Sequence, residues 1–244
     1  MLIYGINPVI EALRAGRVTS IRVSPRADDR LTTVVRLAQD KGIPVRRVTA
    51  ADLDRAAGDA GRHRHQGVVA DASDASIFSI EDLVARASGP PLIVVLDGIE
   101  DPHNVGAILR TVDAAGADGV VRQTRHAAPL GGAAAKASAG AVAHVKIAEV
   151  VNIARALEQL KNAGVWTVGL AKNAERTYDQ IDYTLPTAIV LGAEGAGLRR
   201  LVRERCDWVA SIPMRGHVES LNVSVAAGIA LFEARRQREA TRER

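Results

Sequence analysis

Short apolar runs alternate with segments of helical period along almost the whole chain. The runs are rich in Val, Ile and Leu, as in buried strands, and the segments between them repeat apolar positions every three or four residues. The predicted strands are residues 2–4, 21–23, 44–48, 67–70, 92–96, 119–122, 142–147, 165–170, 187–191 and 209–212. The predicted helices are residues 7–16, 31–39, 51–57, 105–115, 153–161 and 221–232. This order predicts an α/β fold with a mostly parallel sheet and helices on both of its faces.

The chain is predicted to divide into two domains. Residues 1–72 alternate strands and helices and have enough apolar positions for a core of their own. Residues 73–90 are mostly small and polar and run into Pro90 and Pro91, which is the composition of a linker. After this stretch the alternation becomes more regular. We therefore expect a small α/β domain at 1–72, a linker at 73–90 and a larger α/β domain at 91–244.

Composition restricts the class of protein. With 244 residues, of which 47% are hydrophobic and 25% charged, the chain has the composition of a globular protein rather than of a disordered one. Its single cysteine, Cys206, excludes an internal disulfide and a cysteine-rich zinc site. The sequence has neither an apolar run of membrane length nor a signal peptide, so we expect a cytoplasmic protein.

Arginine carries most of the positive charge. The pI is about 9.6, and only five of the 32 basic residues are lysines. Because the planar guanidinium group suits phosphate, nucleic acid is a candidate partner. The same bias arises in genomes that favour arginine codons, and composition does not separate the two explanations.

A basic cluster precedes the last predicted strand of the small domain: Arg62, His63, Arg64, His65 and Gln66. Two histidines separated by one residue, with no cysteine or carboxylate in the cluster, are too few ligands for a metal site. Two interpretations remain. The cluster is a solvated loop that contacts RNA phosphates, or it is a solvated loop without a partner.

Three turns that follow buried strands carry most of the polar residues of the larger domain: residues 101–111, 191–198 and 212–226. In open parallel sheets, ligands bind at the C-terminal ends of the strands, where such turns lie. The second turn is rich in glycine, which lets a ligand approach the backbone closely. Its GxxGxG spacing differs from that of a dinucleotide-binding turn, and no phosphate-loop lysine follows it.

Polar residues of the first and third turns adjoin predicted helix starts. Asn104 is placed to cap the helix that follows the first turn. Ser220 and Asn222 are placed in the same way before the last helix, whose buried face is lined by small residues and admits a close backbone neighbour. Arg110 lies on a helix, where it is either an ordinary exposed arginine or a site residue that tertiary packing brings to the strand ends.

The three turns, in this order and spacing, resemble the signature motifs of the SpoU class of SPOUT RNA methyltransferases. Residues 4–8 and 65–68 are similar to the small substrate-binding domain that precedes the catalytic domain in this family. The resemblance therefore extends over nearly the whole chain. Within the family, the chain most resembles the bacterial large-subunit (23S) rRNA guanosine 2′-O-methyltransferases.

This resemblance implies a fold, a cofactor and an assembly. The implied fold is a small L30e-like α/β domain for RNA binding, followed by a parallel α/β sheet whose C-terminal part is threaded into a trefoil knot. The implied cofactor is S-adenosylmethionine, with no metal. Family members are homodimers with the site at the subunit interface, to which the helix from Leu221 to Phe232 would contribute. The implied activity is methylation of a ribose 2′-hydroxyl in ribosomal RNA.

The resemblance also implies roles for individual residues. Those implied to contact the cofactor are Gly192, Ile212, Met214 and Leu221. Those implied for catalysis and substrate positioning are Asn104, Arg110, Glu194, Ser220 and Asn222. Those expected to contact RNA are Arg62, Arg64, His65 and Lys136. Because the chain has only seven aromatic residues, we expect RNA to be recognised through phosphates and 2′-hydroxyls rather than by base stacking.

Three alternatives stay open from the sequence. Arg110 either takes the proton of the ribose hydroxyl, or binds the target phosphate and stabilises the nascent alkoxide; a guanidinium is normally a donor rather than a base. An enzyme of the same class acting on transfer RNA would share every catalytic motif, although the small N-terminal domain favours ribosomal RNA. A non-catalytic RNA-binding protein of this fold would not need Asn104, Arg110 and Glu194.

Overall fold

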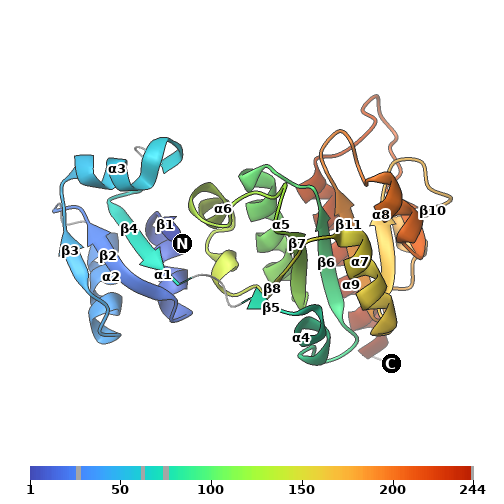
Figure 1. Cartoon of the computed structure of the whole chain (residues 1–244), viewed down its shortest axis with the longest axis horizontal. Coiled ribbons are helices and arrows are strands. Elements are labelled where there is room, and N and C mark those ends of the chain that lie inside the picture. The colour runs from blue at the N-terminus through green and yellow to red at the C-terminus, as the bar shows by residue number, and fades with distance from the viewer. Residues whose placement is uncertain (26–28, 62–63, 74–76, 243–244) are drawn as a thin grey trace. The chain divides into compact units, whose positions relative to one another are not determined.

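The computed structural model of the chain describes residues 1–25, 29–61, 64–73 and 77–242, which fall into two compact units (Figure 1). The first unit comprises Met1–Ala75, Pro102–Arg110 and Ala128–His144, and the second comprises Ser76–Asp101, Thr111–Ala127 and Val145–Arg244. The two units are therefore interleaved in sequence. Helix α5 (Pro102–Ala115) contributes its N-terminal part to the first unit and its C-terminal part to the second.

A four-stranded sheet organises the first unit. Its strands lie in the order β1 (Leu2–Tyr4), β4 (Val68–Ala72), β2 (Val18–Val23) and β3 (Val45–Arg47). Strand β4 is antiparallel to both of its neighbours, and β2 is parallel to β3. Helices α1 (Ile6–Arg14), α2 (Asp29–Asp40) and α3 (Ala50–Gly61) alternate with these strands. The side chains of Tyr4, Leu53 and Val69 are buried together and form a core within this unit.

Two short helical elements complete the first unit and contact α1. These are α6 (Gly132–Ala137) and the 3₁₀ helix η1 (Ala141–Ala143). Between them, Gly140 has a φ of 98°, and a Cβ there would lie only 2.5 Å from the Cβ of Glu11 on α1. The strand predicted at 142–147 is therefore wrong over most of its length, because this stretch turns against α1. Strand β8 spans Ile147–Val150.

A parallel sheet of eight strands forms the centre of the second unit. The strand order is β10-β12-β9-β11-β6-β7-β8-β5, and every pair is parallel. The strands not yet named are β5 (Ile77–Phe78), β6 (Leu92–Asp97), β7 (Gly119–Gln123), β9 (Trp166–Leu170), β10 (Arg176–Thr177), β11 (Thr187–Gly192) and β12 (Trp208–Ser211). All residues of β6, β7 and β11 are buried, which explains why β6 and β11 are mostly apolar. The predicted α/β fold with a mostly parallel sheet is confirmed.

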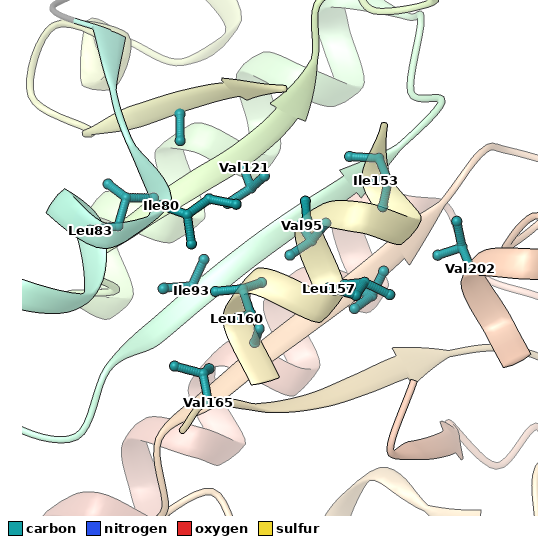
Figure 2. Close-up of a cluster of buried hydrophobic side chains, with 14 of the residues drawn as sticks. Ile80, Leu83, Ile93, Val95, Val121, Ile153, Leu157, Leu160, Val165 and Val202 are labelled. Carbon is teal, nitrogen blue, oxygen red and sulfur yellow. The ribbon is translucent and has the colours of Figure 1, made fainter. Parts of the chain in front are cut away.

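One face of this sheet is covered by α7 (Ile153–Asn162). Figure 2 shows Ile153, Leu157 and Leu160 of this helix among the side chains of Val95 and Val121 from β6 and β7. The three helix residues recur at the spacing of one helix face, and each is fully buried. Helix α8 (Arg200–Arg205) adds a single buried valine to the same core.

The other face of the sheet is covered by α9 (Val223–Arg242). Ala188 and Val190 of β11 belong to the α7 side, so the alternating residues Ile189 and Leu191 point to the opposite side. Helix α9 contacts both β11 and the short 3₁₀ helix η2 (Tyr178–Gln180) there. The predicted last helix is thus confirmed, although it begins two residues later and ends ten residues later than expected.

Part of the segment predicted as a linker is folded. Strand β5 pairs with β8 at the edge of the sheet, and α4 (Ile80–Ala85) follows it. Ser79 caps α4, because its hydroxyl accepts from the N–H of Asp82 and the Asp82 carboxylate accepts from the N–H of Ser79. Ile80 and Leu83 are buried in the α7 cluster. Residues 77–85 therefore belong to the core of the second unit.

Candidate active site

The glycine-rich turn after β11 folds back over the end of its own strand. A Cβ on Gly192, the last residue of β11, would lie 2.1 Å from the carbonyl carbon of Gly197, so no larger residue fits there. Gly195 and Gly197 have φ angles of 78° and 69°, in the left-handed region that favours glycine. The N–H of Gly197 donates to the carbonyl of Ala193 at 2.8 Å and closes the turn. The side chain of Glu194 is left exposed.

The N-terminus of α9 lies at the end of the third turn. Asn222 directly precedes the helix, and its side-chain oxygen accepts hydrogen bonds from the N–H and the hydroxyl of Ser224, at 2.8 and 2.6 Å. The cap predicted at Asn222 is therefore confirmed. Ser220 lies two residues earlier, exposed in the loop.

A hydrogen bond joins the second turn to the third. The side-chain amide of Asn222 donates to Oε1 of Glu194 at 3.2 Å. Because the oxygen of the same amide is held by Ser224, the nitrogen is oriented toward the carboxylate. The pair lies at the C-terminal ends of the strands, where parallel sheets bind their ligands.

A cavity of about 340 Å³ lies beside this hydrogen bond, within the second unit. Its size is that of a small-molecule site. The predicted residues that line it are Gly192, Glu194, Ile212, Met214, Ser220, Leu221 and Asn222. The fold thus gathers all four residues predicted to contact a cofactor and three of the five predicted for catalysis.

Charged groups of both signs lie at the cavity. Lys172 and Glu219 both line it, and their Nζ and Oε2 atoms are 3.6 Å apart. The side chain of Lys172 is half exposed and that of Glu219 is largely exposed, so each is available to a charged ligand. With Glu194, the cavity therefore offers two carboxylates and one ammonium group around apolar walls.

Sequence reasoning missed a buried ion pair next to the second turn. Asp97, the last residue of β6, is fully buried and accepts hydrogen bonds from the backbone N–H (2.9 Å) and the Nε (2.7 Å) of Arg199. The Nη2 of Arg199 contacts the same carboxylate and donates to the side-chain oxygen of Gln123 at 3.0 Å. The available signal was an aspartate at the end of an otherwise apolar strand, because a buried carboxylate requires a partner.

Asn104 and Arg110 both lie on α5, in the part that belongs to the first unit, and neither lines the cavity of the second unit. The helix begins at Pro102, so the cap predicted at Asn104 is wrong: the residue lies in the first turn and is buried. Arg110 is exposed, about 120° away around the helix axis. Gly106 between them lets α5 approach α6 closely, since a Cβ there would lie 2.6 Å from the carbonyl oxygen of Ala134.

The residues predicted to contact RNA divide into two groups in the first unit, while Arg62 lies outside the described residues. Arg64 is exposed, and Lys136 donates from Nζ to the Arg64 carbonyl at 3.1 Å. His65 is instead buried. Its Nδ1 accepts from the N–H of Gly67 at 3.0 Å, and its Nε2 lies 3.3 Å from a carboxylate oxygen of Asp54. Both ring nitrogens of His65 thus have partners inside the unit, and its contact with RNA stays a prediction.

Three further kinds of functional feature bear on the part of the chain that the structure describes: a metal-binding group, a membrane-spanning helix and a nucleophilic cysteine. Within it, no three side chains of His, Cys, Asp or Glu gather as a metal-binding group. No described helix is both long and apolar enough to cross a membrane. Burial raises the pKa of the Cys206 thiol to about 12, so this residue is not a thiolate nucleophile at neutral pH.

Comparisons with known proteins match both units. The model of the SpoU rRNA Methylase family matches residues 91–232, and that of the RNA 2′-O ribose methyltransferase substrate binding domain matches residues 2–77. The 23S rRNA (guanosine-2′-O-)-methyltransferase of Pseudomonas syringae is 46% identical over 99% of this chain and 97% of its own. The AdoMet-bound rRNA methyltransferase of Sinorhizobium meliloti superposes with a TM-score of 0.75 at 27% identity, over 96% of this chain and 86% of its own. The TrmH/SpoU tRNA modifying enzyme of A. aeolicus has a TM-score of 0.57 at 34% identity, over 65% of this chain and 81% of its own.

Proposed function

The chain belongs to the SpoU rRNA methylase family, and we propose that the cavity between its second and third turns is where this enzyme binds S-adenosylmethionine. The activity is transfer of the cofactor's methyl group to the 2′-hydroxyl of a guanosine in 23S ribosomal RNA. One observation carries the assignment of the site. Glu194 and Asn222, from turns distant in the sequence, are hydrogen-bonded at the edge of a single cavity.

The chemistry of the cavity suits this cofactor. S-adenosylmethionine carries an ammonium group, a carboxylate and a sulfonium cation, together with a flat adenine ring. The carboxylates of Glu194 and Glu219 suit its cations, and Lys172 suits its carboxylate. The side chains of Ile212 and Leu221 offer apolar surface to the adenine. When bound, the cofactor supplies an electrophilic methyl group on its sulfur.

We propose that the backbone around Gly192 and Met214 completes the cofactor contacts. Both residues line the cavity, and the backbone of Gly192 is not screened by a side chain. Backbone N–H and C=O groups are obligatory hydrogen-bonding groups, which suits the polar edge of an adenine ring. These contacts would orient the cofactor without a charged side chain at its ring.

The chain's residues then have to position a ribose hydroxyl, which is a weak nucleophile. Attack must be in line with the carbon–sulfur bond, and ideal positioning can supply roughly 7–11 kcal/mol of a barrier. Ser220 and Glu194, the latter held by Asn222, line the cavity and are assigned to this positioning. Asn104 and Arg110 are assigned to the substrate by the family motif.

The role of Arg110 can be tested by Arg110→Lys, with Asp113→Asn on the same helix as the control. Arg110 either takes the proton of the ribose hydroxyl or stabilises the nascent alkoxide. Both roles predict a fall in kcat of about 10²–10³-fold, because the bidentate fork is lost. A base role predicts a changed pH profile as well, whereas a role in stabilising the alkoxide leaves the profile unchanged. Full activity with an unchanged profile would exclude both.

The first unit favours ribosomal over transfer RNA as substrate. The relative from Pseudomonas syringae, named for 23S rRNA, matches 99% of the chain, whereas the tRNA modifying enzyme of A. aeolicus matches 65%. The N-terminal residues match a substrate-binding domain. We propose that exposed Arg64, with Lys136 and Arg62, contacts phosphates of this RNA.

The proposal extends to assembly, chain threading and location. Val225 and Phe232 of α9 are about half exposed, at 49% and 50%, and their spacing of seven places them on one helix face. This apolar face supports a homodimer through α9. We further propose that the second and third turns belong to a trefoil knot, and that the enzyme works in the cytoplasm, where ribosomal RNA is methylated.

A methyl-transfer assay tests the function. Purified protein receives S-adenosylmethionine with a labelled methyl group, together with 23S rRNA or tRNA from cells that lack this enzyme. We expect label at a guanosine 2′-oxygen of the 23S rRNA, and its loss in Asn222→Ala. Label in tRNA alone would identify tRNA as the substrate in place of 23S rRNA. Absence of binding of S-adenosylmethionine would refute the proposal that the protein is an enzyme.

A further inference from the structure

Arg199 is the ion-pair partner of the Asp97 carboxylate. The carboxylate is fully buried, and the guanidinium of Arg199, about half of whose side chain is exposed, reaches in from the surface. Removing one partner of a buried pair leaves an uncompensated charge, which is strongly unfavourable. Because Arg199 donates from both its backbone N–H and its side chain, the pair fixes the main chain at residue 199 as well.

The fixed main chain is one end of the turn that forms a wall of the cavity. Arg199 is the second residue after Gly197, and most residues from Gly192 to Gly197 line the cavity. At the other end, the turn is set by the close packing of Gly192 against Gly197. Glu194 lies between the two ends. A displacement of Arg199 would therefore move Glu194 and the cavity wall.

We propose that Asp97 and Arg199 are positioning residues that set the affinity of the cavity for S-adenosylmethionine. Neither lines the cavity, so they act through the turn rather than by contact. Gln123, at the end of β7, orients the outer side of the guanidinium through its side-chain oxygen. The proposal rests on the proposed function, which supplies the identity of the ligand.

Arg200 is a matched control for Arg199. It is adjacent in sequence and also forms an ion pair, but with the exposed Glu204 one turn later on α8, at 2.7 Å. Its side chain is largely exposed. Replacing it removes the same charge from the same region without touching Asp97.

The first measurement is calorimetric titration with S-adenosylhomocysteine. We expect Arg199→Gln to weaken the Kd roughly 10- to 100-fold, as a small misplacement of a binding wall does. The Kd of Arg199→Lys should lie between those of wild type and Arg199→Gln, because the lysine ammonium group reaches Asp97 but lacks the fork for Gln123. Arg200→Gln should stay within about 2-fold of wild type. A purely structural role would lower the unfolding midpoint of Arg199→Gln and leave its Kd unchanged, which would overturn the proposal.

Amide hydrogen exchange of residues 193–198 without ligand is the second measurement. We expect exchange at least about tenfold faster in Arg199→Gln than in Arg200→Gln, because the turn loses one anchor. Equal exchange in the two variants would overturn the proposal. If wild type does not bind S-adenosylhomocysteine, the proposed function fails, while hydrogen exchange still tests the anchor. If Arg199→Gln does not fold, Arg199→Lys against Arg200→Lys decides in both measurements.

Discussion

Arg238 fastens the C-terminal half of α9 to the starts of two central strands. Its guanidinium donates to four carbonyls: those of Tyr183 (2.8 Å), Pro90 (2.6 Å), Pro91 (3.1 Å) and Leu185 (3.1 Å). Pro91 directly precedes β6, and Leu185 lies two residues before β11. This side chain therefore links segments of the second unit that are far apart in the sequence.

We expect Arg238→Met to lower the free energy of unfolding by about 3 kcal/mol. The bonds to Tyr183 and Pro91 are partly buried, and a lost hydrogen bond to a charged group costs roughly 1.5–3 kcal/mol. The lower value applies to both, because some water reaches the carbonyls once the arginine is gone. The bonds to Pro90 and Leu185 are exposed, so water replaces them at little cost. Methionine keeps the apolar stem of the side chain in place.

Urea unfolding followed by tryptophan fluorescence measures this effect. The only tryptophans of the chain, Trp166 and Trp208, both belong to the second unit, which contains Arg238. Arg235→Met is the control, because Arg235 pairs at 2.8 Å with Glu239 one turn later on the same helix, and both side chains are about half exposed. The urea midpoint of this control variant should stay close to that of wild type. Equal midpoints for the two variants would refute the reasoning.

Two further predictions concern a buried tyrosine and a partly buried aspartate of the second unit. The hydroxyl of Tyr183 is fully buried and has no hydrogen-bond partner among the described residues. Tyr183→Phe should therefore raise the free energy of unfolding by about 1 kcal/mol. A urea midpoint below that of wild type would show that the hydroxyl has a partner. Burial alone would raise the pKa of Asp207. Hydrogen bonds from Lys161 and Thr167 outweigh this effect and hold the pKa below its ordinary value. The unfolded chain then binds this proton more readily, so the stability from Asp207 is complete above pH about 4 and is lost as the pH falls through the folded-state pKa. The urea midpoint of Asp207→Asn should therefore lie below that of wild type at pH 7 and approach it below pH 4, and a gap that does not change with pH would contradict the cause.

The sequence was sufficient to predict the central strands and to select residues of two following turns that line one cavity. Strands β6 and β11 are apolar over most of their length because both of their faces are buried, and such runs are visible without a structure. Local chemistry likewise identified the cap at Asn222 and the tight turn at Gly192. Each of these features depends on residues that are neighbours in the chain.

Features that depend on distant residues were not predictable. Asp97 and Arg199 are 102 residues apart, and only the fold makes them partners. The helix α4 was obscured by its shortness and by the small and polar residues on either side of it, because two buried residues, Ile80 and Leu83, suffice for its packing. The last turns of α9 are rich in arginine and lack an apolar face, and bonds such as those of Arg238 hold them instead.

The order of strands in the large sheet has a consequence for synthesis of the protein on the ribosome. Strand β6 lies between β7 and β11, and Leu92 pairs with Thr187, so about 95 further residues must be made before β6 gains its second neighbour. At about 5–20 residues per second, this interval lasts roughly 5–20 s. During it, the nascent chain presents an apolar strand with one open edge, the kind of segment that pairs with other chains. Nascent-chain chaperones are expected to engage this segment until translation of β11 is complete.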